Sequence, residues 1–255
     1  MLQTLKKHQF LLEELIKRDF KRKYKGTIFG MAWSILNPLL TLLIMRIVFS
    51  HFFGAQIDHY TTYLFCGTLV FSFFNESTSE GMLSLVGNAG IFTKVNVPKY
   101  LFLFAKNTQT LLNFALTLLV FFVFCIADRI SFSWRFIALL YPIGMLLLFN
   151  MGMGLILSAL YVFFRDMQYL WSVLTQLLMY LSAVFYSIDT FPLWARNAYL
   201  LNPVYLFIRY FRKVVIEGCI PSPGFHVLMM FDATATVLLG AYIYKKYNTE
   251  FLYYV

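Results

Sequence analysis

Charged residues are scarce in this chain. Asp, Glu, Lys and Arg make up only 13% of its 255 residues, whereas soluble globular domains contain about 25%. Hydrophobic residues make up 60% and aromatic residues 20%, which excludes both an ordinary soluble enzyme and intrinsic disorder. Because the apolar residues fall in long blocks, the sequence predicts an all-α, polytopic membrane protein in which residues 1–255 form a single transmembrane domain.

The chain also lacks the sequence patterns of common catalytic and metal sites. Its three cysteines, Cys66, Cys125 and Cys219, are far apart and form no metal-binding spacing, so neither a disulfide framework nor a metal site is predicted. No Gly-x-x-x-x-Gly-Lys-Ser/Thr loop is present to hold ATP, and no His-Glu-x-x-His or Gly-x-Ser-x-Gly motif occurs. The sequence therefore predicts a chain that is not an enzyme and that holds no cofactor.

Six apolar blocks approach the length of about 20 residues that a helix needs to cross a bilayer. They are residues 28–53, 60–77, 101–127, 136–163, 169–187 and 227–244. The net charge of +9 is no sign of nucleic-acid binding, because eight of the 21 basic residues lie within the first 25 residues and flank the first block. Lys and Arg are concentrated before the first block, in alternate loops and after the last block. This bias predicts that both termini are cytoplasmic.

Three segments outside these blocks have features of their own. Residues 1–27 form a basic amphipathic helix, with Asp19 as an exception on its apolar face; it is either a topology anchor or the edge of a lateral entrance. Residues 78–100 predict a short helix and a linker on the cytoplasmic side. Residues 188–224 are apolar but interrupted by proline, so they form either outer re-entrant helices that cover a passage or a loop lying on the membrane.

Polar residues recur at four-residue spacing within two of the blocks. Trp33, Asn37 and Thr41 share one face of the first block, and Ser172, Gln176 and Tyr180 share one face of the fifth. Such groups need partners inside a membrane, either on another helix or along a hydrated passage. A passage with hydroxyls, amides and aromatic faces suits sugar rings. Lys106, near the cytoplasmic end of the third block, is expected to extend its side chain to the headgroups.

Four stretches resemble one known family in order and spacing. The sequence from Tyr24 to Leu40 is similar to the start of the ABC-2 type permeases that export polysaccharide, and residues 88–98 resemble the family's cytoplasmic coupling segment. Phe164-Arg165-Asp166 resembles the turn after its fourth span. Asn202-Pro203, followed by Arg212 and Gly218, resembles its outer re-entrant region. Arg209 departs from the pattern, because many members carry an acidic residue there.

The resemblance implies six transmembrane helices and a homodimer in the bacterial cytoplasmic (inner) membrane. It also implies two copies of a separate cytoplasmic ATPase that binds ATP and Mg²⁺, and a lipid-linked polysaccharide as substrate, such as O-antigen, capsular polysaccharide or teichoic acid. The ATPase contact is expected at seven residues: Asn88, Ile91, Lys94, Val95, Pro98, Arg165 and Asp166. The alternatives are an ABC-2 exporter of a small lipid or drug, and a membrane enzyme of glycolipid synthesis.

Overall fold

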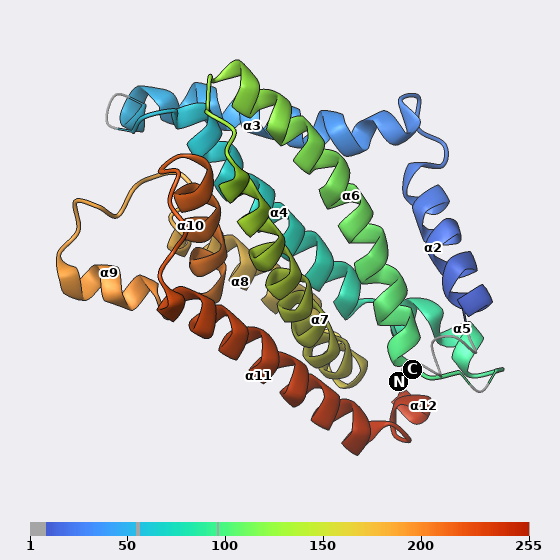
Figure 1. Cartoon of the computed structure of the whole chain (residues 1–255). Coiled ribbons are helices and arrows are strands. Elements are labelled where there is room, and N and C mark those ends of the chain that lie inside the picture. The colour runs from blue at the N-terminus through green and yellow to red at the C-terminus, as the bar shows by residue number, and fades with distance from the viewer. Residues whose placement is uncertain (1–8, 55–56, 96, 255) are drawn as a thin grey trace.

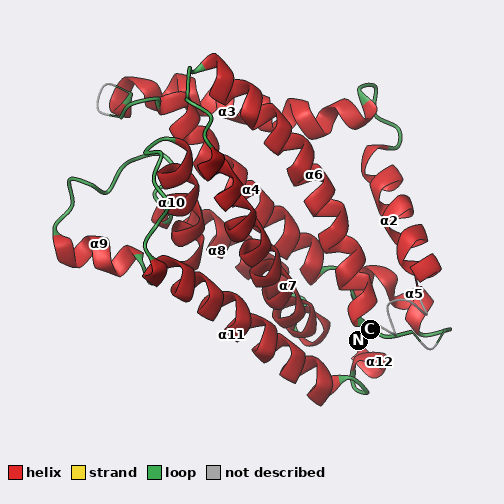
Figure 2. Cartoon of the chain, viewed as in Figure 1, coloured by secondary structure: helices red, strands yellow, loops and turns green. Residues whose placement is uncertain are grey.

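The computed structural model describes residues 9–54, 57–95 and 97–254 of the chain, and the regular structure in these ranges is entirely helical (Figure 2). This confirms the predicted all-α class. The elements in chain order are α2 (Gln9–Tyr24), η1 (Gly30–Ala32), α3 (Trp33–Phe53), α4 (Tyr60–Met82), η2 (Val86–Asn88), α5 (Ala89–Phe92), α6 (Tyr100–Ala127), η3 (Trp134–Leu139), α7 (Leu140–Phe163), α8 (Met167–Leu181), α9 (Leu193–Tyr199), α10 (Pro203–Val215), α11 (Pro223–Tyr247) and α12 (Phe251–Tyr254).

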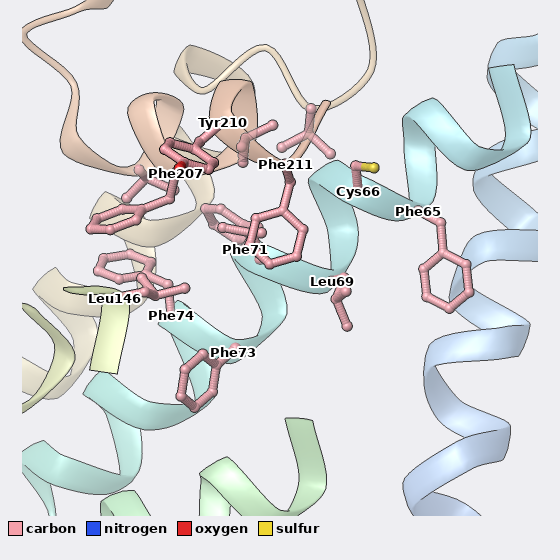
Figure 3. Packing of buried hydrophobic residues seen from close by; sticks show 14 of the residues in the cluster. Phe65, Cys66, Leu69, Phe71, Phe73, Phe74, Leu146, Phe207, Tyr210 and Phe211 are labelled. Carbon is pink, nitrogen blue, oxygen red and sulfur yellow. The ribbon is translucent and has the colours of Figure 1, made fainter. Parts of the chain in front are cut away.

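Helix α4 is the centre of the bundle. It packs against α3, α6, α7, α8 and α10, and most of its residues are buried. Its aromatic side chains form the main hydrophobic core with the short helix α10: Figure 3 shows Phe71 and Phe74 on α4 together with Phe207 and Phe211. The rest of the bundle is arranged around α4 (Figure 1).

Polar contacts as well as aromatic ones join α4 to α6 and to Asp128, the residue that follows α6. Thr62 donates to Asp128 Oδ2 (2.7 Å), and Ser77 donates to Asn107 Oδ1 (2.5 Å). Because the partner number on α6 falls as the number on α4 rises, the two helices are antiparallel. Polar side chains of one helix thus satisfy those of the other, as the interior of a membrane requires.

Helices α7 and α11 pack closely through glycines. A Cβ atom on Gly152 would lie 2.5 Å from the backbone of Thr236, and one on Gly240 would lie 2.9 Å from the carbonyl oxygen of Gly152. Ser158 and Tyr244 share a hydrogen bond of 2.6 Å farther along. The residue numbers in these contacts rise together along α7 and α11, so the two helices run parallel. Small residues allow such close approach where lipid supplies no hydrophobic driving force.

A second hydrophobic cluster closes the end of the bundle at which α5 lies, here called the α5 end. It joins α2, α6, α7, α11 and α12 through side chains that include Leu15, Phe92, Phe102, Val162 and Phe251. Helix α2 lies along α6 at the edge of the bundle (Figure 1). The opposite end, which carries α9 and α10, is called the α10 end.

Among the described residues, four helical segments are long and apolar enough to cross a membrane: Trp33–Phe53, Tyr100–Ala127, Trp134–Phe163 and Pro223–Tyr247. They match four of the six predicted blocks. Helix α4 has 23 residues but carries many Ser, Thr, Asn and Glu side chains, and α8 has only 15 residues. Length and composition therefore support four spans, and the count of six is not confirmed.

The structure gives the helix boundaries within the three segments outside the apolar blocks, which the sequence does not specify. Residues 188–224 contain two helices, α9 and α10, and α10 begins where Asn202 accepts from the backbone N–H of Val204 (3.0 Å). Residues 78–100 contain the last turn of α4 followed by η2 and α5. In the N-terminal segment the structure describes α2, and residues 1–8 lie outside the described ranges.

Replacing Gly152 by alanine is expected to destabilise the fold. The added methyl group would overlap the backbone of α11, and overpacking of this kind costs about 1–3 kcal/mol. Thermal unfolding of the purified protein in detergent measures the effect. Gly144→Ala is the control on the same helix, because no atom lies within 4 Å of its added Cβ. Equal unfolding temperatures for the two variants would contradict the glycine-mediated packing of α7 and α11.

Candidate functional site

The predicted coupling segment combines a buried anchor with an exposed tip. Phe92 is buried in the cluster at the α5 end, whereas Lys94 and Val95 are exposed and Ile91 and Pro98 are half-buried. Thr93 Oγ1 donates to the carbonyl oxygen of Ala89 (2.7 Å), which closes α5 before the tip. The tip is therefore the part of this segment that another protein can reach.

Asn88 lies inside the protein. Its side chain is 4% exposed, its amide nitrogen donates to the carbonyl oxygen of Ser84 (2.8 Å), and its Oδ1 accepts from Arg18 Nη2 on α2 (2.7 Å). The sequence predicts Asn88 as an ATPase contact. That contact stays a prediction; within the chain, the Asn88 side chain joins the coupling segment to α2.

Arg18 belongs to a charge cluster, defined here as Arg18, Asp19, Glu80 and Lys106, that joins α2, α4 and α6. Arg18 Nη2 lies 2.7 Å from Asp19 Oδ1. Lys106 Nζ lies 3.3 Å from Asp19 Oδ2 and 2.8 Å from Glu80 Oε2. The Asp19 side chain is only 3% exposed. Its place on the apolar face of α2 is thereby explained, and ion pairs replace the predicted extension of Lys106 to the headgroups.

The second predicted coupling stretch, Arg165-Asp166, connects α7 to α8 at the same end. Both residues are exposed, and Arg165 Nη2 donates to the carbonyl oxygen of Tyr254 on α12 (3.4 Å). Just before α12, Lys99 Nζ donates to the backbone and side-chain oxygens of Asn248, and burial lowers the pKa of this lysine. Arg165 of the second stretch and Lys99, which follows the first, therefore both contact the C-terminal region around α12.

Trp33, Asn37 and Thr41 line one wall of a cavity of about 410 Å³ between α3, α4 and α6. We call it the α3–α4–α6 cavity. The facing walls carry Glu76 on α4 and Asn113 on α6, whose side chains share a hydrogen bond of 2.8 Å. The four-residue spacing on α3 therefore marks one wall of an open cavity that has both polar and apolar side chains.

Ser172, Gln176 and Tyr180 lie elsewhere. All three are exposed along one face of α8, and none of them lines the α3–α4–α6 cavity. The opposite face of α8 is buried, and there Trp171 Nε1 donates to Thr78 Oγ1 on α4 (3.3 Å). Within one chain the two predicted sets of passage residues are therefore on separate surfaces.

The α10 end is organised around Arg212. This residue is 2% exposed, and its guanidinium donates to the carbonyl oxygens of Ala183 (2.9 Å) and Val184 (2.8 Å). The guanidinium carbon also lies 3.5 Å from the centroid of the Tyr63 ring. A Cβ on Gly67 would lie 3.0 Å from Arg212 Nη2, so the glycine lets the guanidinium lie close to α4 without a tight contact. Arg212 thus fixes the chain after α8 to α4 and α10.

A second cavity of about 560 Å³ opens at the α10 end. Charged and aromatic side chains line it, among them Tyr63, Tyr186, Asp189, Arg209 and Glu217. Arg209 Nη1 lies 2.6 Å from Glu217 Oε1. The basic residue that departs from the family pattern therefore has an acidic partner in this chain.

Comparison with known proteins identifies the family. Residues 11–216 match the family model described as ABC-2 type transporter. The chain belongs to the ABC-2 type transporter family. The O-antigen export system permease protein RfbA of Klebsiella pneumoniae is 28% identical over 243 residues, which cover 94% of this chain and 93% of the relative.

Other relatives of this ABC-2 chain have similar names. RfbA of Myxococcus xanthus, also an O-antigen export system permease protein, is 27% identical over 98% of this chain and 97% of its own length. The polysialic acid transport protein KpsM of Escherichia coli is 22% identical over 92% of each chain. The family inferred from the four sequence stretches is confirmed.

Several residues at these sites are not predicted from the ABC-2 sequence. Glu76 and Asn113 are 37 positions apart, and only the antiparallel packing of α4 on α6 joins them. Asp19 has one sequence signal, a carboxylate on an otherwise apolar helix face, but nothing in the sequence names Lys106 as its partner. Among the described residues, no group of three or more His, Cys, Asp or Glu side chains could hold a metal ion.

Asp19→Asn is expected to destabilise the ABC-2 chain by about 1.5–3 kcal/mol, since Arg18 and Lys106 lose a buried carboxylate partner although Lys106 keeps Glu80. In a double-mutant cycle with Lys106→Met, the destabilisation of the double variant should be smaller than the sum of the two single destabilisations by about 1 kcal/mol or more. Thermal unfolding in detergent measures both. Glu14→Gln is the control on α2, because its pair with Lys17 is exposed and such pairs contribute little. A strictly additive cycle would show that Asp19 and Lys106 are not coupled.

Proposed function

We propose that this chain is the permease subunit of an ATP-driven exporter that moves a lipid-linked polysaccharide across the bacterial cytoplasmic membrane. O-antigen, capsular polysaccharide and teichoic acid are the candidate polymers. The observation that carries the proposal is the match to O-antigen export permeases over more than nine-tenths of both chains. Because these relatives are named as polysaccharide exporters, they favour this function over export of a small lipid or drug, and over an enzyme of glycolipid synthesis.

We propose six spans, with α4 and α8 added to the four apolar helices and both termini in the cytoplasm. Helix α4 tolerates its polar residues because it lies inside the bundle and α6 satisfies them. Helix α8 extends about 22 Å at 1.5 Å per residue, which is shorter than a hydrocarbon core of about 30 Å. In this proposal α9 and α10 form a re-entrant region that fills the outer leaflet next to the short helix α8, and Arg212 holds this region in place.

The exposed face of α8 supports a homodimer. Ser172, Gln176 and Tyr180 lie there among exposed apolar residues such as Val173 and Leu177. An amide and a hydroxyl facing lipid would lack hydrogen-bond partners. A second copy of the chain would supply such partners, and the passage for the polymer would then lie between the protomers. A sugar polymer needs such a polar route because each unpaired hydroxyl in hydrocarbon costs free energy on the kcal/mol scale.

The α5 end supports docking of two cytoplasmic ATPase subunits, one on each protomer. Lys94 and Val95 form an exposed tip, and Arg165 and Asp166 are exposed beside it. The tip is joined to α2 and α6 through Asn88, Arg18 and the rest of the charge cluster. Movement of the ATPase would therefore reach the membrane helices through a short chain of ionic contacts.

Deleting the gene in its bacterium should abolish the surface polysaccharide and leave lipid-linked polymer on the cytoplasmic side, and the wild-type chain should restore export. The double variant Lys94→Glu with Pro98→Ala should insert into the membrane but fail to restore export, because it alters the tip of the docking segment. Surface polysaccharide and membrane-associated polymer are the quantities to measure.

Two controls accompany this test. Arg135→Gln changes an exposed charge at the opposite end, where Arg135 donates to the carbonyl oxygen of Gly218, and it should restore export. Co-purification of the ATPase shows whether docking itself is changed. Unaltered surface polysaccharide after deletion would refute the proposed function. Normal export and normal ATPase recruitment by the double variant would refute only the docking assignment.

A further inference from the structure

One amide on α7 is buried without hydrogen bonds. Asn150 is fully buried, and neither its Nδ2 nor its Oδ1 has a hydrogen-bond partner among the residues that the structure describes. It lies ten residues into α7 from Leu140, about 15 Å of helix, and so near the middle of a segment long enough to cross the membrane. Buried polar groups are nearly always paired, and an unpaired amide costs free energy. Asn150 therefore needs an explanation beyond packing.

Three helices cross closely in this part of the bundle. A Cβ atom on Gly81 of α4 would lie 3.1 Å from the Cα of Gly154 on α7 and 3.0 Å from Leu103 Cδ1 on α6. The rings of Phe74 on α4 and Phe149 on α7 also pack together, with centroids 6.0 Å apart. The residue numbers in these contacts rise together along α4 and α7. Helix α7 therefore runs parallel to α4, and α6 runs antiparallel to both.

One turn toward the α10 end, each of the three helices carries a polar residue: Ser77 on α4, Asn107 on α6 and Asn150 on α7. Each is four positions from the crossing residue of its own helix and therefore shares its face. Ser77 Oγ donates to Asn107 Oδ1 (2.5 Å), and Asn107 Nδ2 donates to the carbonyl oxygen of Leu103 (3.1 Å). Two of these residues are thus paired, whereas Asn150 lies at the same level with no partner in the described part of the chain.

The paired residues are next to the charge cluster. Lys106 directly precedes Asn107 on α6, and Glu80 lies one turn along α4 from Ser77. Lys106 Nζ and Glu80 Oε2 are 2.8 Å apart, and Arg18 joins the cluster to the coupling segment. A displacement of the coupling segment therefore acts on α4 and α6 within one turn of the Ser77–Asn107 hydrogen bond.

We propose that Asn150 is a positioning residue for ATP-driven transport and replaces Ser77 as the hydrogen-bond partner of Asn107 when the ATPase binds ATP. Rotation of α7 brings the two amides together, and the crossing allows it because Gly81 and Gly154 have no side chains to interlock. Ser77 then bonds a carbonyl oxygen one turn earlier in its own helix, as serine does in helices. The inference rests on the proposed function, since it specifies how the ATPase changes the membrane helices.

Asn150→Leu tests the proposal, because leucine has the same branched shape without polar atoms. In nanodiscs that hold the permease with its ATPase but no nucleotide, the variant should unfold about 2–4 °C above wild type, since no unpaired amide is left. After trapping with ATP and orthovanadate it should unfold below the trapped wild type, since the hydrogen bond to Asn107 is lost. Shifts of the same sign in the two conditions, or no shift in either, would overturn the proposal.

Asn107→Leu is the matched control on α6. It makes the same substitution at the same level, but the Asn107 side chain is paired, so the variant should unfold below wild type without nucleotide. Asn150→Val is a smaller second variant in case leucine overpacks the site. An unfolding temperature below wild type without nucleotide in both Asn150 variants would overturn the proposal, because it would show that the amide stabilises this conformation.

Export in cells separates this inference from the proposed function. In the deletion strain, Asn150→Leu should restore surface polysaccharide about fivefold more slowly than the wild-type chain, as expected for the loss of one hydrogen bond. If both restore it at the same rate, the positioning role is refuted and the export function stands. If deletion leaves surface polysaccharide unchanged, the export function is refuted, whereas the unfolding temperature without nucleotide still tests the unpaired amide.

Discussion

Polar groups inside a membrane must find their partners within the protein, and this constraint determines the position of α4. The helix carries Thr62, Glu76, Ser77 and Glu80; the last three have partners on α6, and Thr62 pairs with Asp128 directly after it. A helix with this composition is stable in a bilayer only when other helices surround it. The central packing of α4 places its charged end beside the coupling segment and its aromatic end beside α10. The same polar residues make α4 too hydrophilic to count as a span by composition alone.

Most of the helical architecture could be predicted because long apolar blocks leave few alternatives. The third block, 101–127, differs from α6 by one residue, and the family was evident from four stretches in order. Interactions between distant residues could not be predicted. In the sequence, Asp19 is an unexplained carboxylate on an apolar helix face, and only the structure shows Lys106 Nζ 3.3 Å from it. Likewise, nothing in the sequence pairs Glu76 with Asn113. Such pairs depend on the register of packed helices, which periodicity along one helix does not specify.

The predicted site residues also differ in how much of their role a sequence pattern can specify. Trp33, Asn37 and Thr41 share a helix face, and the structure gives that face a cavity. Ser172, Gln176 and Tyr180 share a face too, but within one chain that face is exposed, and its part in a passage between two protomers stays a proposal. At the α5 end, Asn88 is buried and Lys94 is exposed although both lie in one short segment. A sequence pattern finds the segment, and only packing decides which side chains are accessible.

The central claim is that this chain forms a membrane passage for polysaccharide whose energy comes from a separate ATPase on the inner face. Reconstitution of the permease and its ATPase in lipid vesicles loaded with lipid-linked polysaccharide tests it most directly, with transfer across the bilayer measured by access of an added glycosidase. The account predicts transfer that needs both proteins and hydrolysable ATP. Equal transfer by the permease alone, or no transfer by the complete system with ATP, would contradict it.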